Sequence, residues 1–208
     1  MFGTQHLGLF FASALLLIVT PGQDTLYIVG RSLSQGRRAG VLSACAITCG
    51  TAIHTLAAAY GLAAILAASA QAFQFIKLAG AAYLTYLGIR MIAERATADP
   101  TAPVFAKASD WAVFRAGLLT NVLNPKVALF FLAFLPQFVS PDAESRVRAF
   151  LFLGALFIVS GTLWCLFLAW AASAVNARLR AARSSGLILK RAVGAMFVGL
   201  GVRLAVSK

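Results

Sequence analysis

Acidic residues are scarce in this 208-residue chain, which has six aspartates and glutamates against eighteen lysines and arginines. Asp24 is the one acid deep inside an apolar stretch. An intramembrane aspartyl protease needs two carboxylates that share one site, and a carrier of metal cations would need clustered oxygen ligands in its spans. A single carboxylate argues against both classes.

Cysteine and histidine are also few, with three and two copies. Cys45 and Cys49 are one helical turn apart, but no histidine or carboxylate at a nearby spacing completes a metal site with them. All three cysteines fall inside apolar stretches, so we expect small, buried, reduced thiols. A serine protease would need a nucleophilic serine beside a histidine. The sequence therefore predicts no metal, no cofactor and no enzymatic activity.

Apolar residues, in contrast, make up 61% of the chain, and charged residues only 12%. Soluble domains average just under half apolar and about a quarter charged residues. Runs of about 20 apolar residues are typical of membrane-spanning helices. We therefore predict an all-α transmembrane protein, a bundle of six helices over about 6–33, 41–68, 75–92, 114–139, 149–175 and 192–206.

The net charge of +12 raises the alternative of nucleic-acid binding. The basic residues, however, lie in short clusters between the apolar segments, where they orient spans and meet anionic lipid head groups. Loops 1–2, 3–4 and 5–6 carry most of them, so we expect these loops in the cytoplasm and both termini outside. The partners expected are membrane lipids of a bacterial cytoplasmic (inner) membrane and no nucleic acid.

A hydrophilic stretch at 93–110 divides the single domain 1–208 into two halves. Repeat 1 covers about 1–92 and repeat 2 about 111–208, with three segments each. Pro21 and Pro125 lie half a chain length apart. Because three segments per half make the second half enter the membrane from the opposite side, the layout predicts two inverted three-helix repeats.

Helices 1 and 4 are predicted to be broken near the midplane by Thr20-Pro21-Gly22-Gln23 and by Asn124-Pro125. Proline removes a backbone donor and clashes with the preceding turn, and a broken helix at membrane depth is tolerated where it lines a cavity. We expect Thr20 and Gln23 to form a capping box, and Asn124 to cap a helix with Pro125 at its first position. Two such helix starts would favour a carboxylate between them.

Asp24 and Lys126 are the charged residues beside these breaks. A charge at the bilayer centre costs about 2.5–3.5 kcal/mol on insertion scales, so Asp24 should face the interior. It could accept a proton or contact a substrate amine, while Lys126 attracts a carboxylate or pairs with Asp24. The alternative is an ion pair that only steadies two broken helices.

Three further residues could belong to the same site. His54 suits a proton relay or is a hydrogen-bonded buried histidine. Asn121 lies one turn before Asn124 and could line the cavity. Tyr83, with Tyr86 on the same face, could gate the path or serve packing. The small-residue faces of 149–175 and 192–206 could support a homodimer or internal packing.

Several stretches of the sequence together resemble the lysine exporter (LysE/RhtB) family. They are Thr20-Pro21-Gly22-x-Asp24-Thr25, the loop from Gly36 to Gly40, Gly50-x-x-x-His54-Thr55, Lys77-x-x-Gly80-x-x-Tyr83-Leu84-x-Tyr86-Leu87-Gly88, Asn124-Pro125-Lys126-x-Ala128-Leu129-Phe130-Phe131 and Leu135-Pro136-Gln137-Phe138. Gln23 stands where the family usually has a second proline.

The resemblance implies six hydrophobic segments and export of amino acids or similar small metabolites driven by the proton motive force. Asp24 matches the family's central aspartate, and Asn124, Pro125 and Lys126 match its second motif. The function predicted is a secondary exporter of small zwitterionic amino acids by proton antiport. The alternatives are an exporter of another small solute or cation, or a membrane scaffold that transports nothing.

Overall fold

The protein is described by a computed structural model that covers residues 3–69 and 105–174, isolated positions between 71 and 93, and position 198. Tyr83 and most of the predicted third and sixth segments lie outside the described residues. Within the described part the elements are helical, apart from an isolated bridge between Thr4 and Val139. The expectation of an all-helical protein is therefore confirmed for this part of the chain.

Ten helical elements follow one another along the described chain. They are α1 (Leu7–Val19), α2 (Gln23–Gln35), α3 (Arg37–Leu56), the π-helical η1 (Ala57–Leu62), α4 (Ala63–Ala68), α6 (Asp110–Val122), α7 (Pro125–Leu129), the π-helical η2 (Phe130–Phe134), the 3-10 helix η3 (Leu135–Phe138) and α8 (Arg146–Ala174).

Two of the continuous helices are long enough to cross a bilayer, which takes about 20 residues. The first runs from Arg37 to Ile65 and the second is α8, each with 29 residues. Two further candidates are bent pairs: α1 and α2 meet at 46°, and α6 meets Pro125–Phe138 at 43°. The predicted breaks in the first and fourth segments are thus confirmed, and the described part has two spans, or up to four if each bent pair is one span.

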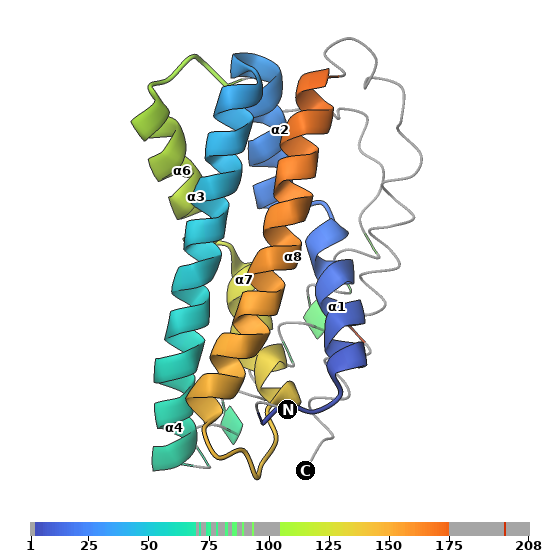
Figure 1. The fold of residues 1–208 in the computed structure, drawn as a ribbon, viewed down its shortest axis with the longest axis vertical. Coiled ribbons are helices and arrows are strands. Elements are labelled where there is room, and N and C mark those ends of the chain that lie inside the picture. Colours follow the sequence, from blue (N-terminus) through green and yellow to red (C-terminus); the bar gives the residue numbers. More distant parts are fainter. Residues whose placement is uncertain are drawn as a thin grey trace.

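The bent pairs run in opposite directions through the structure (Figure 1). The chain rises through α1 and α2 and descends through α6 and α7, while α3 descends and α8 rises. α3 packs against α2, α6 and α8. Each half of the chain therefore contributes one bent pair and one long helix to the described bundle.

At the first break, α1 ends at Val19 with Thr20 as its C-cap, and Pro21 and Gly22 separate this cap from the start of α2 at Gln23. The Thr20 hydroxyl donates to the carbonyl of Leu16, one turn back, and α2 has no side-chain cap. The predicted capping box is therefore wrong. Thr20 closes one helix instead of opening the next, because two residues outside the helical conformation follow it.

The second break has the predicted cap. Asn124 precedes α7, its side-chain oxygen accepts from the Lys126 amide at 3.0 Å, and Pro125 occupies the first turn. The amide of Asn124 in turn donates to the carbonyl of Asn121 at 2.9 Å. The local sequence therefore fixes this helix start in the way expected of an asparagine–proline pair.

Two apolar clusters lie at opposite ends of the bundle. One combines α1, η1, α7 to η3 and the first part of α8, with Phe10, Leu62, Phe131 and Phe150 fully buried. The other joins α2, α3 and the last part of α8 around Ile28 and neighbouring residues. Along α3 and α8 the polar residues treated below lie between these clusters.

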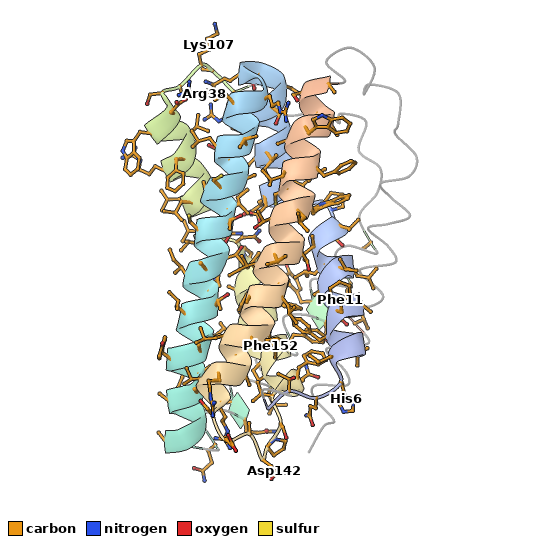
Figure 2. The ribbon with its side chains drawn as sticks, viewed as in Figure 1. His6, Phe11, Arg38, Lys107, Asp142 and Phe152 are labelled. Atoms are coloured by element: carbon orange, nitrogen blue, oxygen red, sulfur yellow. The ribbon has the colours of Figure 1, made fainter. Side chains whose placement is uncertain are left out.

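The second cluster lies at the end that carries Arg38 and Lys107, whereas His6 and Asp142 mark the other end (Figure 2). At the basic end the segment 105–109 is tied to α2. Arg31 is buried under Phe105, 4.4 Å from its ring centroid, and donates to the carbonyl of Ala106 at 3.1 Å. Tyr27 donates to the carbonyl of Val113 at 2.7 Å.

Cys45 and Cys49 are exposed on α3, and Cys165 is half-buried. The expectation that all three cysteines are buried is therefore wrong. A residue in an apolar stretch can face lipid as easily as the protein interior, because the hydrocarbon phase is as apolar as the core.

Candidate functional site between the two helix breaks

Lys126, from the second break, is bound to the backbone of the first. Its ammonium group donates to the carbonyls of Leu17 at 3.1 Å and Thr20 at 3.0 Å. In a continuous helix the Leu17 carbonyl would accept from residue 21, but Pro21 has no N–H to give. Lys126 thus satisfies carbonyls at the C-terminal end of α1, where a positive charge is also favoured by the helix dipole.

Gly22 makes this approach possible. A Cβ atom at that position would lie 3.1 Å from the Lys126 ammonium nitrogen and 3.4 Å from the adjacent Cε. Contacts that short are rarely tolerated without movement of the neighbouring group. The absence of a side chain at Gly22 therefore leaves the space that the Lys126 side chain occupies.

Asp24, the second residue of α2, joins the same region. One carboxylate oxygen accepts from the side-chain amide of Asn121 at 2.9 Å. The other, Oδ1, is buried without a hydrogen-bond partner among the described residues. Among the described residues the ion pairs are Arg38–Asp110 and Arg148–Glu144. Asp24 and Lys126 both line the cavity described below but form no ion pair with each other.

Asn121 connects the breaks to α3. It is 1% exposed, and its side-chain oxygen lies 3.4 Å from the Thr51 hydroxyl. Its carbonyl, near the end of α6, lies 3.1 Å from His54 Nε2. The His54 ring stacks on Phe131 with 5.9 Å between centroids. His54 is thus hydrogen-bonded beside the site, and it is not among the residues that line the cavity.

A cavity of about 50 Å³ lies between these groups. Its polar wall holds Asp24, Asn121, Lys126 and several threonines, and its apolar wall holds Leu17, Ile18, Ile47, Val127, Phe157 and Ile158. A water molecule needs about 10–15 Å³ on such a measure, so the cavity has room for a few waters. The space in this cavity is therefore smaller than an amino acid.

The other predicted site residues have different positions. Gln23 is exposed, and Asn124 is buried but uses its side-chain oxygen to cap α7. Thr20, Pro21 and Pro125 shape the two breaks and do not line the cavity. The structure thus brings Asp24, Asn121 and Lys126 together on one wall.

α8 supplies a wall that sequence reasoning missed. Ile158, Gly161, Thr162 and Cys165 share one face of this helix, and Trp164 flanks them. The Thr162 hydroxyl is 2.8 Å from that of Thr48 on α3. The signal was a small and polar face, at spacings of three and four residues, on an otherwise hydrophobic helix.

The chain is similar to several bacterial membrane proteins over nearly its whole length. It is 35% identical to an uncharacterized membrane protein of Pseudomonas aeruginosa, over 99% of this chain and 95% of the relative. It is 33% identical to an uncharacterized membrane protein of Vibrio cholerae, over 96% of each. Identity to the leucine efflux protein of Salmonella typhimurium is 26%, over 98% of this chain and 96% of the relative. No solved structure matches the chain.

The LysE type translocator family matches residues 15–208, which include both breaks and the cavity residues described above. This agrees with the resemblance carried by the motifs around Asp24 and Asn124. A translocator is a membrane transporter and not an enzyme, as the sequence predicted. The chain belongs to the LysE type translocator family.

Proposed function

We propose that this protein exports amino acids or related small zwitterionic metabolites from the cytoplasm across the bacterial inner membrane, by proton antiport. One observation carries the proposal: two broken helices from different halves of the chain meet at one cavity, with Asp24 and Lys126 on its wall. Membership of a translocator family and the printed name of the Salmonella relative, a leucine efflux protein, support an amino acid as the substrate.

The chemistry of the cavity suits a molecule with opposite charges at its two ends. Asp24 has a free carboxylate oxygen for an ammonium group. The Lys126 ammonium has three hydrogens, of which two are used by the carbonyls of Leu17 and Thr20. The third hydrogen is free for a substrate carboxylate.

Alternating access would use the apolar clusters as its two gates. One cluster lies toward each end of the bundle, and each would close the cavity on its own side. We further propose that the chain is one domain of six helices, made of two repeats, 1–92 and 111–208, that have opposite orientations in the membrane and meet at the site. The opposite directions of the two bent pairs in Figure 1 support this symmetry. The basic end, with Arg38 and Lys107, would face the cytoplasm.

Proton coupling is assigned to Asp24. A proton on its carboxylate and a substrate ammonium compete for the same oxygen, so release of one favours binding of the other. His54, whose Nε2 lies 3.1 Å from the Asn121 carbonyl beside the site, would relay the proton. This competition is the minimum that an antiport cycle needs.

The experiment is uptake of radiolabelled amino acids, including leucine, into inverted membrane vesicles with an acidic interior. We expect uptake by the wild type and loss of gradient-driven uptake in Asp24→Asn. The matched control is Asp110→Asn, because Asp110 is an exposed acid that pairs with Arg38. If Asp24→Asn responds to the gradient like the wild type, the coupling role is wrong. If the wild type takes up no amino acid, amino-acid export itself is wrong.

A further inference from the structure

Two residues that line the cavity carry buried polar atoms without hydrogen-bond partners among the described residues. One is the Oδ1 atom of Asp24 on α2, and the other is the indole Nε1 of Trp164 on α8. Buried polar atoms in native proteins are nearly always paired, and each unpaired one needs an explanation. Two of them on one small cavity point to a ligand that pairs both.

The two atoms differ in what they can bind. A carboxylate oxygen only accepts hydrogen bonds, whereas the indole N–H only donates. The hydroxyls of Thr48 and Thr51 already donate to backbone carbonyls of α3. A ligand that complements both atoms therefore has a donor with positive charge at one end and an acceptor with negative charge at the other, as an α-amino acid has.

We propose that Trp164 is a substrate-binding residue, whose indole N–H donates to the carboxylate of the bound amino acid beside the free hydrogen of Lys126. The ammonium group of the substrate then lies on Asp24 Oδ1. This assignment rests on the proposed function and gives α8 a direct part in it.

The rest of the cavity selects the side chain. Ile18, Ile47 and Ile158 line it together with Phe157. A second charged group on the substrate would lie against these apolar residues without a partner, which is strongly unfavourable. The site therefore takes neutral amino acids with aliphatic side chains in preference to lysine or glutamate.

A purely structural tryptophan would behave differently. Trp164 also packs on Phe167, with ring centroids 5.5 Å apart, and loss of such packing would disturb the binding of all substrates alike. Loss of a hydrogen bond to the carboxylate affects only ligands that have a carboxylate. Leucine and isoamylamine separate these cases, because isoamylamine keeps the ammonium group and branched chain of leucine but has no carboxylate.

The test is Trp164→Phe, which removes the N–H and keeps an aromatic ring. The control is Trp170→Phe, because Trp170 is exposed on the same helix and does not line this cavity. Unlabelled leucine or isoamylamine is added as a competitor to transport of radiolabelled leucine by the wild type and each variant, and the competitor concentration for half-inhibition is measured. In Trp164→Phe the leucine concentration for half-inhibition should rise about tenfold to hundredfold, as expected for a hydrogen bond to a charged group. That of isoamylamine should not change, and Trp170→Phe should change neither.

Equal shifts for the two competitors in Trp164→Phe, or no shift for either, would overturn the assignment while amino-acid transport by the wild type stands. If Trp164→Phe does not reach the membrane, the wild type decides: isoamylamine must compete far more weakly than leucine. Equal competition in the wild type means that the carboxylate is not recognised. A wild type that transports no amino acid contradicts the proposed function instead.

Discussion

Gly50→Ala is the substitution that tests the geometry of the site most directly. A Cβ atom at position 50 would lie 2.6 Å from Oδ1, 2.8 Å from Cβ and 3.0 Å from Cγ of Asn121. The Asn121 side chain is held between Asp24 and Thr51 and has no room to retreat without loss of those contacts. The new methyl group must therefore displace Asn121 from Asp24.

The magnitude follows from three terms. Overpacking costs about 1–3 kcal/mol, loss of a hydrogen bond to a charged acceptor about 1.5–3 kcal/mol, and alanine in place of glycine in a helix returns about 1 kcal/mol. The net loss of unfolding free energy is about 1.5–5 kcal/mol. The transition temperature of the purified protein should fall by about 3 °C or more, at about 2–4 °C per kcal/mol for a chain of this size.

Gly61→Ala is the matched control, since a Cβ at that position of the same continuous helix meets nothing within 4 Å. It should leave the protein as stable as the wild type or more so, by about 0.5–1 kcal/mol. Thermal unfolding in detergent gives the stabilities, and uptake of radiolabelled leucine into inverted vesicles gives the activity. Equal stability and equal uptake in the two variants would refute the reasoning.

Two further substitutions test single contacts. Lys126→Met leaves the carbonyls of Leu17 and Thr20 without their donor, so thermal unfolding should show a loss of about 3 kcal/mol or more; an unchanged transition temperature would mean that the lysine does not hold the break. Tyr27→Phe removes the buried hydrogen bond to Val113 and should cost about 1 kcal/mol in the same assay. Half-saturation of leucine uptake should stay unchanged in Tyr27→Phe, because Tyr27 does not line the cavity.

The parts of the fold that sequence predicted correctly depend on local chemistry. Proline inside an apolar span removes a backbone donor and clashes with the preceding turn, so the bends near Pro21 and Pro125 follow from the local sequence. The interior position of Asp24 was expected from one further step, the high cost of a lone carboxylate in lipid, but its hydrogen bond to Asn121 was not predicted. That cost requires a polar partner, and the breaks were the place where polar groups gather.

The errors concern contacts that the local sequence does not determine. Thr20 could cap the helix before it or the helix after it. Because Pro21 and Gly22 separate it from α2, Thr20 is the C-cap of α1. Thr162 was missed although Gly161, Thr162 and Cys165 mark a small and polar face of α8, and nothing in the local sequence distinguishes Trp164 from the tryptophans that face outward. Cys45 was misjudged because lipid and protein interior favour the same residues.

The contact between Lys126 and the backbone around Pro21 affects how the two breaks can separate during transport. Pro21 frees the Leu17 carbonyl, and Lys126 is bound to it and to Thr20. Separation of the two breaks would leave a cation and two carbonyls unpaired at membrane depth, which costs several kcal/mol. A substrate carboxylate on Lys126 removes part of that cost, whereas an empty cavity does not. If alternating access moves the breaks apart, the loaded carrier must therefore open more readily than the empty one, and labelled leucine inside vesicles should leave faster when unlabelled leucine is present outside.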